Sequence, residues 1–190
     1  FWPLSRRTRP KQFLPLAGGG TTLLEKMVEA VSPLVPPADM FIATGDHLAE
    51  ATRRLVPSIP EGNYFLEPAR RNTAGCLALA AAGLLARYGG DGSDITAAVL
   101  ASDHRVGDTE RFRDTLRAAF AAAESHEALV TLGIPPDRPE TGYGYIETAP
   151  SRLHIPGAPP DAEVRRVARF REKPDRADAE SYLADRRFLW

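Results

Sequence analysis

Apolar residues along the first two thirds of the chain alternate between runs of strand length and longer stretches with helical spacing. Four apolar runs predict strands, at residues 39–44, 63–67, 95–102 and 128–134. Three stretches predict helices, at residues 46–55, 73–88 and 108–124. Alternation of strands and helices is typical of βαβ units. The pattern therefore predicts an α/β domain with a mostly parallel central sheet and helices on both faces.

The pattern changes after residue 134. Two Pro-rich loops, PPDRPE and HIPGAPP, bracket the stretch GYGYIETA, and the apolar residues of VRRVARFREK alternate as in a strand. Residues 181–187 are predicted to end a helix. We interpret residues 1–190 as a single domain in which a β-rich extension, residues 135–190, packs on residues 1–134.

Charge and cysteine content limit the classes of protein to which this sequence could belong. The 24 Lys and Arg residues nearly cancel the 25 Asp and Glu residues, so no global field attracts nucleic acid or an anionic membrane. The single cysteine, Cys76, excludes an intrachain disulfide and is typical of a reducing, cytoplasmic setting. No apolar run approaches the roughly 18 residues of a membrane span. We expect no nucleic-acid partner and no membrane association.

The loop SDHRVGD follows the predicted strand at residues 95–102 and carries Asp103 and His104. Ligands of open parallel sheets bind beyond the carboxyl ends of the strands. A lone carboxylate there can hold one corner of a Mg²⁺ whose other ligands are substrate phosphates. Alternatively, Asp103 bonds within its own turn or caps the next helix, and His104 is a turn residue.

Cations and glycines gather near the start of the chain. RRTRPK holds Arg6, Arg7, Arg9 and Lys11, and GGGTT at residues 18–22 leads into the helical pattern LLEKMVEAV. A Gly-rich turn at a helix N-terminus offers backbone N–H groups to a phosphate, so these segments together suggest a polyphosphate site. A flexible surface turn is the alternative, and Lys11 precedes the glycines, unlike the lysine of a P-loop.

Three further segments could contact ligands. EPARRNTA runs from a strand end into a helix, where Arg70, Arg71 and Asn72 could contact a nucleobase or phosphate, or Asn72 or Thr73 could simply cap the helix. Cys76 on that helix is interpreted as a core residue rather than a catalytic one.

The glycines of ETGYGYIE, Gly142 and Gly144, could let the backbone approach a sugar or could form a bulge. In FREKP, Glu172 and Lys173 are neighbours on a predicted strand and should point to opposite faces.

The order of these segments is more specific than any one of them. The series FWPLSR, PKQFLPL, EPARRNTAG, SDH, PETGYGYIE, FREKPD and FLW resembles the mannose-1-phosphate guanylyltransferases, a branch of the sugar-nucleotidyltransferase family. The resemblance runs over the whole chain. It implies a Rossmann-like nucleotidyltransferase domain that joins GTP to mannose 1-phosphate and releases GDP-mannose and pyrophosphate with the help of Mg²⁺. Residues 1–134 would bind the nucleotide and residues 135–190 the sugar.

The resemblance also implies roles for single residues. Arg6 and Lys11 match the pair that contacts the triphosphate and steadies the leaving pyrophosphate, and Asp103 matches the Mg²⁺ ligand. Arg71, Asn72 and Thr73 match the motif at the guanine end. Gly144 and Glu172 match sugar-binding positions, and Lys173 matches the contact to the sugar phosphate.

The sequence departs from the family pattern at both of its ends. The family's glycine-rich loop of the type LAGGxGTR, which precedes FWPLSR in relatives, is absent, and FLW matches a point where relatives continue. We therefore expect the sequence to be a fragment of a longer enzyme.

Two alternatives stay open: transfer to a different hexose or heptose 1-phosphate, and a non-catalytic regulatory homologue that senses the nucleotide sugar. The intact set of Lys11, Asp103 and Glu172 favours catalysis. The sequence is compatible with a homo-oligomer but does not predict one.

Overall fold

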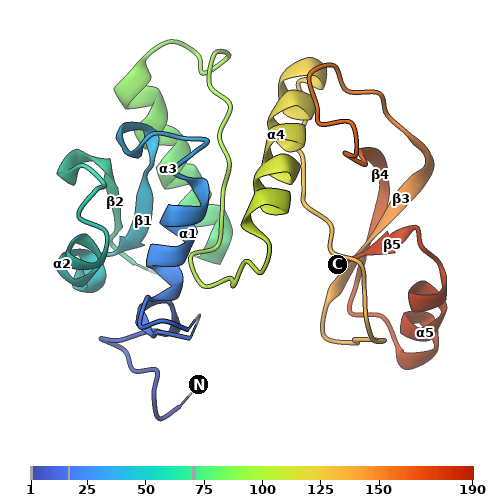
Figure 1. Ribbon diagram of the computed structural model, residues 1–190, viewed down its shortest axis with the longest axis horizontal. Coiled ribbons are helices and arrows are strands. Elements are labelled where there is room, and N and C mark those ends of the chain that lie inside the picture. Colours follow the sequence, from blue (N-terminus) through green and yellow to red (C-terminus); the bar gives the residue numbers. More distant parts are fainter. Residues whose placement is uncertain (1, 17, 70–71) are drawn as a thin grey trace. The chain divides into compact units, whose positions relative to one another are not determined.

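The computed structural model describes residues 2–16, 18–69 and 72–190. The chain divides into two compact units, Phe1–Arg113 and Asp114–Trp190 (Figure 1). Within the described ranges, no helix is both long and apolar enough to cross a membrane. The assignment of residues 1–134 to the nucleotide and 135–190 to the sugar stays a prediction.

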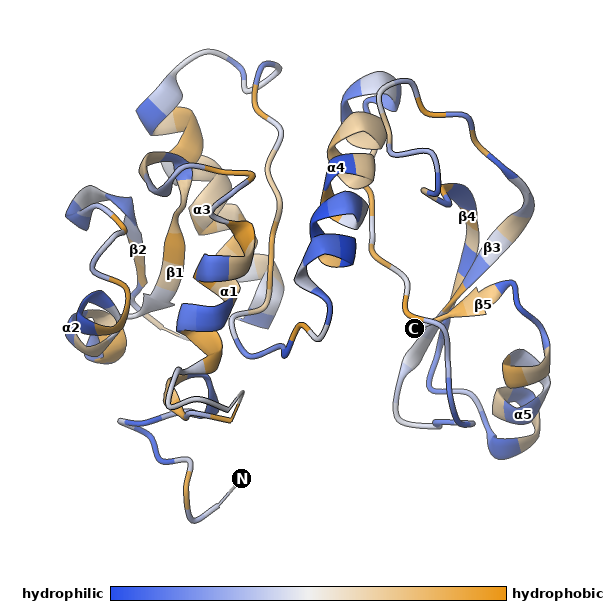
Figure 2. Ribbon diagram, viewed as in Figure 1, coloured by the Kyte–Doolittle hydropathy of each residue, from blue (hydrophilic) through white to orange (hydrophobic). Residues whose placement is uncertain are grey.

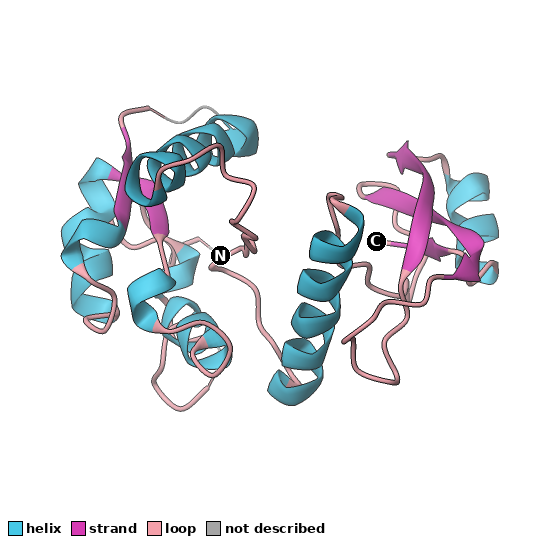
Figure 3. Ribbon diagram, turned by 90° about the horizontal axis from the view of Figure 1, so that it is seen from above, coloured by secondary structure: helices cyan, strands magenta, loops and turns pink. Residues whose placement is uncertain are grey.

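A parallel pair of strands lies at the centre of the first unit. Strand β1, Ile42–Gly45, pairs in parallel with β2, Tyr64–Glu67. Helix α2, Asp46–Leu55, follows β1 directly, as predicted, and helix α3, Asn72–Tyr88, follows β2. The mixed α/β fold with a parallel sheet is therefore confirmed, and Figure 3 shows the two strands among the helices of this unit.

Helices cover both faces of this strand pair. On one face, Tyr64 of β2 belongs to a buried cluster with Leu24 of helix α1, Leu23–Val31, and Leu48 of α2. Phe65 points to the other face because successive residues of a strand alternate. A Cβ added to Gly83 of α3 would overlap the Phe65 ring, so α3 lies directly on that face.

The start of α1 is stabilised by a capping box. The Thr22 hydroxyl accepts a hydrogen bond from the Glu25 N–H at 3.2 Å, and the Glu25 carboxylate accepts one from the Thr22 N–H at 2.8 Å. Removing such a cap typically costs about 1 kcal/mol. Gly18, Gly19 and Gly20 precede it with positive φ angles, where a residue with a side chain would be strained.

Two predicted strands are wrong. Residues 95–102 and 128–134 do not form strands, although Figure 2 shows hydrophobic residues along the first of these segments. An apolar run becomes a strand only where a second backbone pairs with it. Within the described residues, the second run has such pairing at Ile134, which exchanges hydrogen bonds of 2.9 and 2.8 Å with Trp190. Val99 and Leu129 are accordingly exposed.

Helix α4, Thr109–His126, confirms the helix predicted at residues 108–124. Its sequence spans the division between the two units. Leu116 is buried as the apolar spacing predicts, together with Ala118 and Ala122.

The second unit is built on an antiparallel sheet. Its strand order is β4–β3–β5, with β3 at Gly144–Arg152, β4 at Arg165–Glu172 and β5 at Phe188–Leu189. Helix α5, Arg176–Ala184, is capped by Asp175 and ends three residues earlier than predicted. Tyr145, Ala179 and Phe188 form the buried core between sheet and helix. The predicted β-rich character of this region is confirmed.

Candidate functional site

A cavity opens where the two parallel strands end. Gly45 and Glu67, the last residues of β1 and β2, are partners in the strand register. Ligands of open α/β sheets bind at this edge, beyond the carboxyl ends of the strands. The cavity has a volume of about 380 Å³, and its polar side chains are Gln12, Thr44, His47 and Glu67.

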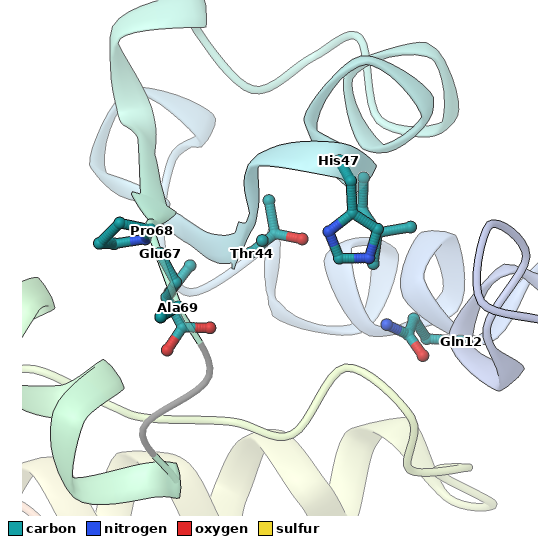
Figure 4. A pocket seen from close by; sticks show the side chains of 9 residues that line it. Gln12, Thr44, His47, Glu67, Pro68 and Ala69 are labelled. Carbon is teal, nitrogen blue, oxygen red and sulfur yellow. The ribbon is translucent and has the colours of Figure 1, made fainter.

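Four separate elements bring these side chains to the cavity (Figure 4). Thr44 lies on β1 and Glu67 ends β2, whereas His47 belongs to the first turn of α2. Gln12 lies in the short 3₁₀ helix Lys11–Phe13, which is anchored by the buried Phe13. Figure 4 shows Thr44 between Glu67 on one side and His47 on the other.

The Cys76 thiol forms a hydrogen bond with the carboxylate of the cavity residue Glu67. Burial, the negative charge of Glu67 and a hydrogen bond to its carboxylate together raise the pKa of the Cys76 thiol. A thiol with a raised pKa is mostly protonated at neutral pH and is a poor nucleophile. Cys76 is half-buried rather than fully buried, so it is a packing residue at the edge of the core and an unsuitable catalytic one.

The predicted guanine-binding motif is only partly described. Arg71 lies outside the described residues. Asn72 begins α3 with a φ of 58°, in the left-handed region that asparagine tolerates, and Thr73 follows it. Both side chains are exposed and follow Glu67 by a few residues. Their role in nucleotide binding stays a prediction.

Lys11 and Asp103 are far apart in the sequence and meet in the structure. The Lys11 ammonium lies 2.7 Å from the Asp103 carboxylate, and the two side chains are 38% and 30% exposed. An ion pair this exposed contributes little to stability. The ion pair instead holds a cation and a carboxylate side by side in the first unit. Part of each side chain is accessible to a ligand.

The other cationic and glycine-rich features are arranged differently. The Arg6 and Arg9 backbones exchange hydrogen bonds of 2.9 and 3.0 Å, which closes RRTR into a tight turn. The Arg6 guanidinium lies 5.8 Å from the centre of the Trp2 ring, in cation–π geometry. At the glycine turn, the Glu25 carboxylate occupies the N-terminus of α1, where a phosphate would otherwise bind. This arrangement favours the surface-turn interpretation of GGGTT.

Asp103 could supply only one of the ligands that a divalent metal ion needs. The family resemblance of the sequence implies a divalent metal. In the described part of the chain, no group of three or more His, Cys, Asp or Glu side chains could hold such an ion. Mg²⁺ is commonly bound by one or two carboxylates plus substrate phosphates, so a half-exposed Asp103 is compatible with it.

The second unit brings together three predicted sugar-binding residues. Gly144 and Glu172 are partners in the β3–β4 register. A Cβ at Gly144 would lie 2.9 Å from a Glu172 carboxylate oxygen, so glycine leaves the space in which this carboxylate lies. The Lys173 N–H donates to the Tyr143 carbonyl at 3.1 Å.

The prediction that Glu172 and Lys173 point to opposite faces is wrong. Strand β4 ends at Glu172, and Lys173 has a φ of 43°. This left-handed residue breaks the alternation of the strand, and the ammonium and carboxylate lie 3.9 Å apart. Both side chains are exposed, so the pair presents both charges to solvent next to Gly144.

Sequence reasoning missed the cavity residues Gln12, His47 and Glu67. The rule about the carboxyl ends of parallel strands could have found two of them, because GDH follows directly on the predicted strand 39–44 and Glu67 ends the predicted strand 63–67. Gln12 was not recognisable, because it comes from a distant segment of the sequence.

Curated relatives match the chain over its whole length. The chain is 43% identical to the mannose-1-phosphate guanylyltransferase ManC of Salmonella typhimurium and 42% identical to the mannose-1-phosphate guanylyltransferase of Escherichia coli K12. In both comparisons all of this chain is matched, but it spans only 38% of the length of the relative.

Solved structures agree with these relatives. The crystal structure described as mannose-1-phosphate geranyltransferase from Thermus thermophilus matches with a TM-score of 0.79 and 38% identity, over 100% of this chain and 51% of that one. The sequence profile of the family described as nucleotidyl transferase matches residues 1–190. The chain, with its α/β fold and its cavity at the ends of two parallel strands, belongs to the nucleotidyl transferase family.

Proposed function

We propose that the full-length protein transfers GMP from GTP to mannose 1-phosphate, giving GDP-mannose and pyrophosphate. The observation that carries this proposal is the 43% identity to a mannose-1-phosphate guanylyltransferase over the whole chain. The pairing of Lys11 with Asp103 supports it, because the family resemblance assigns both residues to the reaction and the fold brings them together.

In the proposed reaction, an oxygen of the sugar phosphate attacks the α-phosphorus of GTP in line with the departing pyrophosphate. Two anions must approach each other, so positioning and neutralisation of charge supply most of the catalysis. Lys11 and Arg6 would neutralise the triphosphate and the leaving pyrophosphate. No protein nucleophile is required, in agreement with the raised pKa of Cys76.

We propose Asp103 as the ligand of a Mg²⁺ ion. Asp103 would hold the ion, which would supply positive charge to offset that of the substrate phosphates. The Asp103 carboxylate lies 2.7 Å from the Lys11 ammonium, so the residue proposed for the metal and the residue proposed for the triphosphate are neighbours.

We place the guanine at the cavity beyond the ends of β1 and β2. The Glu67 carboxylate lies there, and Arg71, Asn72 and Thr73 follow it in the sequence. Guanine offers N–H donors at N1 and N2, which suit a carboxylate acceptor, whereas the corresponding edge of adenine offers no such pair of donors. Glu67 would therefore favour GTP over ATP.

We place the sugar phosphate in the second unit. Gly144 leaves room for the Glu172 carboxylate, which would accept hydrogen bonds from sugar hydroxyls, and Lys173 would bind the phosphate. We further propose a cytoplasmic location, because the single cysteine suits a reducing compartment.

The test is pyrophosphate release by the full-length protein with Mg²⁺, the four common nucleoside triphosphates and a panel of sugar 1-phosphates. We expect release with GTP and mannose 1-phosphate. Release with GTP and another hexose or heptose 1-phosphate would keep the chemistry and change the substrate. Binding of GDP-mannose without release from any pair would mean that the protein is a sensor.

A further inference from the structure

His47 presents an uncommitted imidazole to the cavity. It lies in the first turn of α2, two residues after the end of β1, and lines the cavity opposite Glu67 (Figure 4). Within the described residues, no side chain or backbone group forms a hydrogen bond or an ion pair with this ring. A neutral imidazole always carries one N–H donor. The cavity therefore has a donor available for a ligand, facing the acceptor that Glu67 supplies.

The ring of His47 is placed by Gly45. A Cβ built on Gly45 would lie 2.9 Å from Cε1 and 3.0 Å from Nδ1 of His47, and only these two atoms of the ring come within 4 Å. The ring thus rests against the glycine backbone through one edge, and Nε2 is the ring nitrogen farther from it. Gly45 itself has a φ of −69° and a ψ of 143°, which any residue can adopt. The glycine is needed here for the space that it leaves and not for its backbone freedom.

We propose that His47 is a purine-binding residue of the transferase, whose Nε2–H donates a hydrogen bond to N7 of the guanine. This inference rests on the proposed function and extends it to a residue that the sequence motifs do not include. Guanine has two different polar edges: N1 and N2 carry donors on one, whereas N7 and O6 are acceptors on the other. Glu67, an acceptor, and His47, a donor, lie on two sides of the cavity and match these two edges in kind. A pyrimidine has no N7, so His47 would favour purines while Glu67 selects guanine among them.

The test replaces one atom of the substrate and one side chain of the protein. The full-length protein is assayed for GDP-mannose formation with GTP and with 7-deaza-GTP, in which a C–H group replaces N7 and the N1, N2 and O6 groups remain. The quantity measured is the ratio of kcat/KM for GTP to kcat/KM for 7-deaza-GTP. One neutral hydrogen bond predicts a ratio of roughly 3 to 10 for the wild type.

Two variants and one control complete the cycle. His47→Ala should lower kcat/KM for GTP by the same factor and bring the ratio to about 1, because the donor is gone. Gly45→Ala should also bring the ratio toward 1, because the added methyl displaces the ring without straining the backbone. His126→Ala removes a histidine from the end of α4, outside the cavity lining, and should keep the wild-type ratio.

The outcomes separate this inference from the proposed function. Equal ratios in the wild type and in His47→Ala, with normal use of GTP by both, would overturn the role of His47 and leave the guanylyl transfer intact. A wild type that neither binds nor uses GTP would overturn both proposals. Gly45→Ala gives an independent answer if His47→Ala proves to be misfolded by circular dichroism.

Discussion

Gly144→Ala should impair use of the sugar phosphate while leaving the fold and the use of GTP intact. The added Cβ would lie 2.9 Å from Oε2 of Glu172, closer than real Cβ atoms approach an oxygen. The Gly144 backbone is not in the left-handed region, so alanine introduces no backbone strain. The Glu172 side chain is 73% exposed and can swing away into solvent. The substitution therefore moves one carboxylate and little else.

The expected magnitudes follow from that geometry. Surface changes of this kind alter the free energy of unfolding by about 0.5 kcal/mol or less. A hydrogen bond between a sugar hydroxyl and a charged carboxylate contributes about 1.5–3 kcal/mol. Its loss would lower kcat/KM for mannose 1-phosphate by roughly 10- to 150-fold, at about 1.4 kcal/mol for each factor of ten.

The assay measures kcat and KM for each substrate in the full-length protein, with the other substrate saturating. Gly142→Ala is the matched control, because its added Cβ would lie 3.4 Å from the Glu140 carboxylate, close to ordinary contact. We expect a raised KM for mannose 1-phosphate in Gly144→Ala alone and an unchanged KM for GTP in both variants. Equal kinetics in the two variants, or an equal rise in both KM values, would refute the assignment of Glu172 to the sugar.

Three further variants test other parts of the structure. Asp103→Asn should abolish Mg²⁺-dependent turnover without changing the circular dichroism spectrum, because an amide cannot offset the metal's charge; undiminished turnover would remove Asp103 from the mechanism. Gly83→Ala should lower the free energy of unfolding, since overpacking against the Phe65 ring costs about 1–3 kcal/mol and outweighs a helix-propensity gain of roughly 1 kcal/mol. A stabilised variant in urea unfolding would show that α3 does not lie on Phe65. Glu67→Gln should speed alkylation of Cys76 by iodoacetamide at pH 8, measured by mass spectrometry, because removing the Glu67 charge lowers the pKa of the thiol and increases the thiolate fraction. An unchanged rate would contradict the contact between Cys76 and Glu67.

Local patterns predicted the helices better than the strands. Helix α2 has the predicted bounds, because its apolar spacing, the acidic Asp46 in its first turn and the basic Arg53 and Arg54 in its last turn all lie within the helix itself. The apolar run at residues 95–102 has equally clear strand character in the sequence, yet strand formation depends on a paired neighbour. No local pattern contains that information.

For the candidate site, the sequence predicted individual residues but not their arrangement in space. Motifs identified Lys11 and Asp103 separately, but only the fold shows that their side chains meet at 2.7 Å. Strand alternation placed Glu172 and Lys173 on opposite faces, and the left-handed φ of Lys173 reverses that conclusion. The cavity residue His47 lies in no motif, and only its position just after a predicted strand could have pointed to it.

The most direct test of guanylyl transfer follows the oxygen atoms of the sugar phosphate. The full-length protein is incubated with GTP, Mg²⁺ and mannose 1-phosphate labelled with ¹⁸O in its phosphate. The masses of the products are then measured by mass spectrometry. Attack of the sugar phosphate on the α-phosphorus predicts GDP-mannose that retains all of the label, together with unlabelled pyrophosphate. Absence of GDP-mannose, or label in the pyrophosphate, would contradict the proposed reaction.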